Sequence, residues 1–96
     1  MMVLITYDVN TTTSEGRRRL RQVAKLCVNN GQRVQNSVFE CLVDPTQFKM
    51  LRNKLESTMD SRVDSIRFYL LGDNWKKRVE HLGAKPSYDP EGLLFL

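Results

Sequence analysis

Histidine is nearly absent from this chain, since His81 is the one copy among 96 residues. The sequence therefore offers no convincing Ser-His-Asp or Cys-His nucleophilic site and no histidine-based zinc site. Cysteine is almost as scarce: Cys27 and Cys41 lie in separate apolar stretches, with neither metal-type nor redox-type spacing. We expect both to be buried thiols in a reducing cytosol. Any chemistry must use carboxylates, with the help of an added ion.

Long apolar runs are also missing. Residues 1–5 and 93–96 form the longest runs, far below the roughly 20 residues that span a bilayer. We therefore expect a cytoplasmic protein with no membrane contact. The length predicts one globular domain. The chain has 15 Lys and Arg residues against 11 Asp and Glu residues, which gives a formal charge of +4 and favours a polyanionic partner.

The first third of the chain has the pattern of a strand followed by a helix. Residues 2–9 form an apolar, β-branched run that predicts a central strand. Thr12 and Glu15 have the spacing of a capping box, so we expect a helix to begin near them and to end at Asn30-Gly31. Its apolar stripe consists of Leu20, Val23, Ala24, Cys27 and Val28.

The next part predicts a strand pair, a second helix and another strand. Residues 32–43 alternate with period two, and Asn36-Ser37 is either a tight turn between two strands or a bend. Asp44-Pro45 predicts the start of a helix that ends near Asp60, and residues 65–71 predict a further strand. This order is that of the ferredoxin-like β-α-β-β-α-β sandwich, an α+β fold with two helices on one face of an antiparallel sheet.

The C-terminal region is predicted to reach a second subunit. We assign residues 1–82 to the ferredoxin-like domain, with a short strand around 79–82, and residues 83–96 to a tail. The four apolar residues 93–96 are too many to leave in water at a chain end. We expect the tail to form an edge strand that docks on the partner of a homodimer.

Asp8 is the most suggestive candidate for chemistry, because it lies at the carboxyl end of the first strand, where ligands gather. A helix-entry cap or a turn aspartate is the equally weighted alternative. Mg²⁺ can be held by one or two carboxylates when substrate phosphate supplies further ligands. Two copies of Asp8 that meet across a two-fold axis would provide such a pair. The chemistry that fits is hydrolysis of a phosphodiester bond.

A basic cluster opens the first predicted helix. Arg17 and Arg21 share a helix face with Arg18 beside them, and Lys25 continues it, an arrangement suited to consecutive phosphates. The alternative is a solvated face whose ion pairs contribute little. Ser37 could place a hydroxyl near phosphate, whereas we expect Phe39 to be a core ring.

The combined motifs resemble the small CRISPR-associated nuclease and adaptor family, the dimeric hub of the spacer-acquisition complex. The resemblance rests on Tyr7-Asp8-Val9, on Arg17-Arg18, and on Val34-Gln35-Asn36-Ser37-Val38-Phe39-Glu40. It implies a ferredoxin-like homodimer with Mg²⁺-dependent endonuclease activity on RNA or duplex DNA, Mn²⁺ being a substitute. It also implies Asp8 as the metal ligand, with supporting positions at Tyr7, Arg17, Arg18, Ser37 and Phe39.

The resemblance leaves two roles open. Many members carry a further acid shortly after the first strand, where Asn10 stands here. Members pair with a separate integrase subunit in spacer acquisition and antiviral defence, and some serve there as a scaffold whose nuclease site is dispensable. An enzyme that uses Asp8 and a non-catalytic DNA-binding adaptor that uses the arginines are therefore both compatible with the sequence.

Overall fold

Four strands and two helices build the domain, which is described here for residues 1–83 of a computed structural model. The sheet is antiparallel throughout, in the order β2-β3-β1-β4. This topology confirms the predicted ferredoxin-like fold. The elements are β1 (Met2–Asp8), α1 (Ser14–Asn30), β2 (Gln32–Gln35), β3 (Val38–Leu42), α2 (Pro45–Thr58), β4 (Ser65–Gly72) and a 3-10 helix, η1 (Trp75–Lys77).

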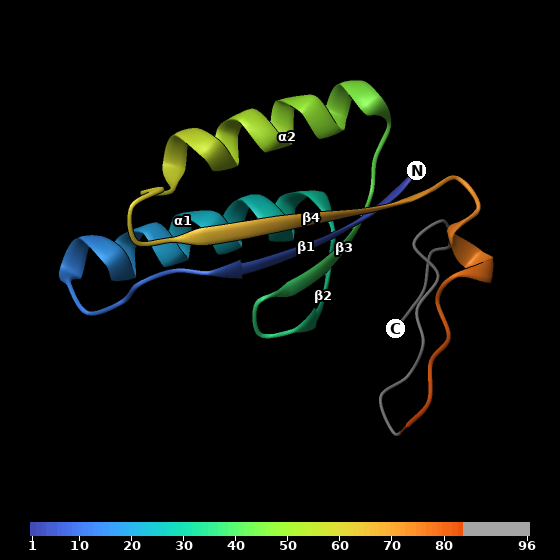
Figure 1. Ribbon diagram of the computed structural model, residues 1–96, viewed down its shortest axis with the longest axis horizontal. Coiled ribbons are helices and arrows are strands. Elements are labelled where there is room, and N and C mark those ends of the chain that lie inside the picture. The colour runs from blue at the N-terminus through green and yellow to red at the C-terminus, as the bar shows by residue number, and fades with distance from the viewer. Residues whose placement is uncertain (84–96) are drawn as a thin grey trace.

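Both helices cover the same face of the sheet and run along its strands (Figure 1). Alternate residues of β1, namely Val3, Ile5 and Tyr7, are buried in one core with Val23 of α1 and Leu55 of α2. Because side chains alternate across a strand, Leu4, Thr6 and Asp8 belong to the opposite face. We call this face, which neither helix covers, the outer face.

The helix starts follow the expected capping chemistry, with one shift. Asp44 accepts a hydrogen bond from the Gln47 amide at 2.7 Å, and the Gln47 side chain accepts from the Asp44 amide at 2.9 Å. This reciprocal pair is a capping box that begins α2. The predicted capping position of α1 was wrong by one residue, since Thr13 is the cap, through its hydroxyl and the Gly16 amide. Thr12 instead donates to the Asn10 side chain from its amide and its hydroxyl.

Two further predictions are decided by the backbone. Asn36 and Ser37 form a turn between β2 and β3, so the tight-turn alternative is confirmed. The strand expected around residues 79–82 is wrong, because β4 leads through a turn into η1 and residues 79–82 are not in a strand. Leu82 there is 95% exposed, so no neighbouring strand covers it in the described part. Residues 84–96, and with them most of the predicted tail, lie outside the described residues.

Among residues 1–83 the structure has no helix that is both long and apolar enough to cross a membrane.

Candidate metal and nucleic-acid site

Asp8 is the last residue of β1 and lies directly opposite Ser65 of β4. Its side chain is exposed, and within the described residues it takes part in no hydrogen bond or ion pair. The helix-cap alternative for Asp8 is therefore wrong, because Thr13 caps α1 and Asn10 accepts the bonds of the turn. A solvent-facing carboxylate at a strand end is free to bind a cation or a ligand.

The neighbouring Tyr7 fixes the end of β1 against the β2–β3 turn. Its amide donates to the Ser37 carbonyl at 3.1 Å, and its hydroxyl donates to the Asn36 carbonyl at 3.4 Å. Its ring stacks on Phe39, with 6.1 Å between the ring centroids. Burial is the main cause that raises the pKa of Tyr7. Tyr7 therefore supports the position of Asp8 from inside the domain.

Phe39 and Ser37 both contact Tyr7, the residue that precedes Asp8. Phe39 is fully buried, at 0% exposure, and the Arg33 guanidinium lies 5.1 Å from its ring centroid. This confirms that Phe39 is a core ring, which a ligand at Asp8 cannot touch. Ser37 is half-buried, and its contribution to the site is the carbonyl that Tyr7 binds.

The segment after Asp8 is held by a buried carboxylate that we did not single out from the sequence. Asp64, 7% exposed, accepts from the Arg19 Nε at 2.8 Å and from the Arg19 Nη2 at 3.3 Å. It also accepts from the amides of Asn10 at 3.0 Å and of Asp60 at 2.9 Å. One carboxylate thus joins α1, the β1–α1 loop and the α2–β4 loop. We call this group of contacts the Asp64 latch.

The electrostatics of the latch favour the charged form of Asp64. Burial acts to raise its pKa, but the Arg19 hydrogen bonds, the two backbone amides and the Arg19 charge together outweigh burial and lower that pKa. Nearby, hydrogen bonds from the Arg62 side chain and amide lower the pKa of Asp60 to about 2. Both carboxylates are therefore ionised at neutral pH.

Gly16 allows α1 to approach the β1–α1 loop closely. A Cβ atom at this buried position would overlap the Asn10 carbonyl oxygen and lie 3.3 Å from the Thr13 hydroxyl oxygen. A glycine is required here by close backbone approach. The loop that follows Asp8 is thus fixed on both sides, by Gly16 and by the Asp64 latch.

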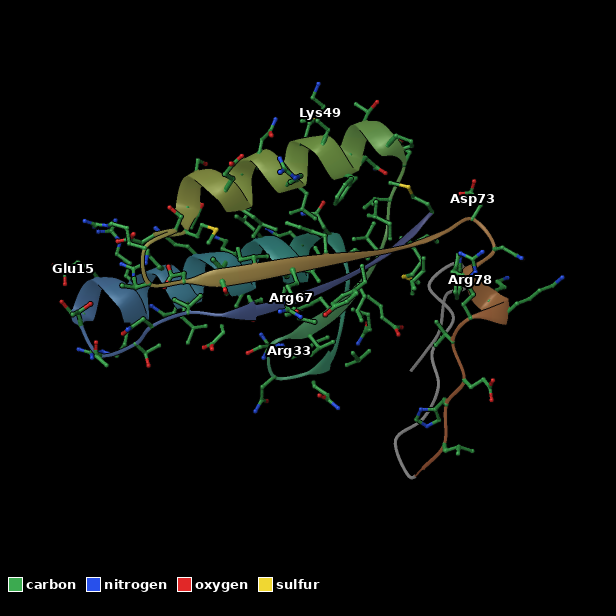
Figure 2. The ribbon with its side chains drawn as sticks, viewed as in Figure 1. Glu15, Arg33, Lys49, Arg67, Asp73 and Arg78 are labelled. Carbon is green, nitrogen blue, oxygen red and sulfur yellow. The ribbon has the colours of Figure 1, made fainter. Side chains whose placement is uncertain are left out.

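The predicted basic residues remain on the surface of α1. Arg17, Arg18, Arg21 and Lys25 are exposed, and within residues 1–83 no salt bridge involves them. The Arg17 guanidinium donates to the Thr11 carbonyl at 3.3 Å. Glu15, at the outer end of α1, points away from the sheet (Figure 2). The solvated-face alternative expected ion pairs along this helix, and the structure has none between these four residues and the described acids.

The family model described as CRISPR associated protein Cas2 matches residues 1–79. The chain belongs to the Cas2 family. The resemblance found in the sequence motifs is thereby confirmed.

Cas2 relatives align with the chain along nearly its whole length. The CRISPR-associated endoribonuclease Cas2 of Chlorobaculum tepidum is 64% identical over 96 residues, which is 100% of both chains. The CRISPR-associated endonuclease Cas2 of Halalkalibacterium halodurans is 60% identical over 94 residues, 98% of each chain. The crystal structure of Streptococcus pyogenes Cas2 at pH 6.5 has a TM-score of 0.74 and 65% identity, and the match covers 86% of this chain and 100% of that chain. Both of these curated relatives are thus named as nucleases, and the Chlorobaculum tepidum protein specifically as an endoribonuclease.

The metal donors of this Cas2 chain are few. Within residues 1–83 no group of three or more His, Cys, Asp or Glu side chains could hold a metal ion. The Asn10 side-chain oxygen is occupied by Thr12, so it does not supply a second ligand in place of the missing acid. Mg²⁺ retains several waters and uses one or two carboxylates together with phosphate oxygens. Asp8 fits such an open site and does not fit a closed site built by a single chain.

The two cysteines take no part in this site. Both are fully buried and unpaired. Burial, the largest cause, raises the pKa of Cys27 to about 12 and that of Cys41 to about 11. These thiols are therefore unreactive at neutral pH, which confirms the expectation of buried thiols.

Proposed function

We propose that this Cas2 protein is a metal-dependent endonuclease that hydrolyses phosphodiester bonds of nucleic acid, duplex DNA or single-stranded RNA. In this proposal two copies of Asp8 share one Mg²⁺, or Mn²⁺ in its place, across the two-fold axis of a homodimer. The observation that carries the proposal is the exposed, unpaired carboxylate of Asp8 at the end of β1. The nuclease names of the relatives support the same reaction class.

The outer face supports the proposed dimer. Its side chains include Leu4 and Val38, both half-buried, and Tyr69, which is 43% exposed. Asp8 belongs to the same face, so two copies that meet through it would bring their Asp8 carboxylates together. An isologous interface opposes a residue to itself, and this is the arrangement that a shared ion requires.

The chain's own residues would divide the work between orientation and binding. Asp8 would hold the ion. Tyr7 would keep the end of β1 in place, and the Asp64 latch would keep the β1–α1 loop in place. The arginines of α1 and Lys25 would contact the phosphates that flank the cleaved bond. When bound, Mg²⁺ would acidify and orient a water and offset the charge of the pentacoordinate phosphate. We further propose that the dimer acts with the integrase subunit in CRISPR spacer acquisition and antiviral defence.

Asp8→Asn tests the nuclease proposal. This variant keeps the shape of the side chain and removes its charge, so we expect the single-turnover cleavage rate in Mg²⁺ to fall by about 100-fold. Cleavage of a short RNA and a short duplex is measured with and without EDTA, using the full-length protein. Asp73→Asn is the matched control, because Asp73 directly follows β4, is 96% exposed, and pairs with the Met1 ammonium at 3.3 Å at the opposite end of β1 from Asp8, so the variant should retain the parent rate. Undiminished cleavage by Asp8→Asn, or by the parent protein in EDTA, would refute the proposal.

A non-catalytic DNA-binding adaptor is the second candidate, and the unpaired cations of α1 favour it. In this case the double variant Arg17→Ala, Arg18→Ala should weaken duplex binding and reduce its salt dependence by about one to two counterions. Asp8→Asn should leave the same binding unchanged. Fluorescence anisotropy over a series of salt concentrations measures both effects, and an unchanged salt slope in the double variant would exclude the role of these arginines.

A further inference from the structure

Arg67 of β4 shares the outer face with Asp8. It lies directly opposite Thr6, and Ser65 lies directly opposite Asp8. Arg67 is therefore the diagonal cross-strand neighbour of Asp8, and such neighbours are about 7 to 8 Å apart, within reach of a long side chain. Figure 2 shows Arg67 along β4, on the side away from α2. Neither composition nor motif spacing singled out this residue.

The guanidinium of Arg67 is anchored and still available. Its Nη1 donates to the Tyr69 hydroxyl at 3.3 Å, which connects two residues of the same strand face. Within residues 1–83 it forms no salt bridge, with Asp8 or with any other described acid. An arginine whose role was to neutralise Asp8 would pair with that carboxylate. The bond to Tyr69, which lies opposite Leu4, instead fixes the guanidinium on the outer face and leaves its remaining donors without a hydrogen bond to the described residues.

We propose that Arg67 binds the phosphate that is cleaved at Asp8 and stabilises the charge that develops on it. This inference rests on the proposed dimeric nuclease. There, two Asp8 carboxylates would cancel the charge of one divalent ion, so the negative charge of the phosphodiester would be left over. That charge grows on the non-bridging oxygens as the bond from phosphorus to water forms and the bond to the leaving oxygen breaks. Two Arg67 guanidinium groups, one from each copy, would compensate it.

The planar guanidinium suits this role. It can donate two parallel hydrogen bonds to two phosphate oxygens, whereas a lysine ammonium acts as a point charge. Tyr69 is a positioning residue, because its hydroxyl orients the Arg67 guanidinium and does not itself need to contact the phosphate. Arginines on α1 differ from Arg67, since they are on the helix layer and would bind flanking phosphates.

The test compares Arg67→Gln, Arg67→Lys and Tyr69→Phe with the parent full-length protein. We expect Arg67→Gln to lower the single-turnover cleavage rate in Mg²⁺ roughly tenfold, because the phosphate would lose one charged donor from each copy. Arg67→Lys should recover part of this loss, and Tyr69→Phe should show a smaller loss. Arg52→Gln is the matched control: Arg52 is an exposed α2 arginine, weakly paired with Glu56 at 3.7 Å, and its loss should change nothing.

A second readout is independent of cleavage. In EDTA, the slope of log Kd against log salt for a short duplex should fall by about one to two in Arg67→Gln and stay unchanged in Arg52→Gln. Thermal unfolding should be the same in both variants. Parent-like cleavage and slope in Arg67→Gln would overturn the inference. If Arg67→Gln behaves like the parent and Asp8→Asn is inactive, only the role of Arg67 is refuted. If Asp8→Asn also cleaves normally, or if the parent cleaves neither RNA nor duplex, the proposed nuclease activity is refuted as well.

Discussion

Asp64→Ala is expected to destabilise the domain by about 3 to 5 kcal/mol, the effect of breaking a buried ion pair by removal of one partner. The change leaves the Arg19 guanidinium, whose side chain is 18% exposed, without its counter-charge. It also leaves the amides of Asn10 and Asp60 without the acceptor that they have now. Equilibrium unfolding in urea, at one fixed protein concentration because a dimer is proposed, measures the difference.

The Arg52–Glu56 pair supplies the control for this experiment. It joins two residues of α2 whose side chains are 51% and 70% exposed. Glu56→Gln should therefore change the free energy of unfolding by less than about 0.5 kcal/mol. A similar small change for Asp64→Ala would show that the latch does not stabilise the fold.

The same latch predicts how stability depends on pH. Since the pKa of Asp64 is lowered in the folded state, its contribution is fully present above the unfolded value of about 3.9 and is lost as the pH falls through the lower folded value. Asp60, with a pKa of about 2, acts in the same direction and the same window. Arg19→Met removes the cation that holds the Asp64 pKa down, so acid unfolding should begin at a higher pH. An unchanged acid midpoint in Arg19→Met would contradict this account.

Local patterns were sufficient for the fold because each element carries its own signal. The alternation over residues 32–43 puts Phe39, Cys41 and Val43 on one face, and all three belong to the core. The Asp44-Pro45 pair correctly marked the start of α2. The error of one residue at Thr13 arose because three consecutive threonines offer the same hydroxyl, and only the backbone decides which of them bonds to Gly16.

Tertiary contacts account for what the sequence could not predict. Arg19 and Asp64 are 45 residues apart, so no local pattern separates Arg19 from its exposed neighbours Arg18 and Arg21. The proximity of Arg67 to Asp8 depends on the register between β1 and β4, which is a property of the paired sheet. The strand expected around 79–82 failed because β4 leads through a turn into η1, and residues 79–82 pair with no strand of the described sheet.

Phe39→Ala is expected to destabilise the domain by about 3 to 5 kcal/mol, as for other fully buried aromatic rings. The change removes a side chain that is 0% exposed and that packs against the Tyr7 ring and beneath the Arg33 guanidinium. Phe39→Leu retains most of the apolar volume and should lose about 1 to 2 kcal/mol. Leu82→Ala is the surface control, because Leu82 is 95% exposed, and its effect should stay within about 0.5 kcal/mol. Urea unfolding ranks the three variants.

Activity measurements on the same variants separate a core role of Phe39 from a role in binding. If Phe39 acts only through packing, cleavage by Phe39→Leu, expressed per folded molecule, should equal that of the parent at temperatures where both are folded. For Phe39→Ala, the loss of cleavage activity should parallel the increase in the unfolded fraction as the urea concentration is raised. A large loss of cleavage in a fully folded Phe39→Leu protein would instead show that the Phe39 ring positions Asp8 through Tyr7. Tyr7 contacts Phe39 and directly precedes Asp8 in β1.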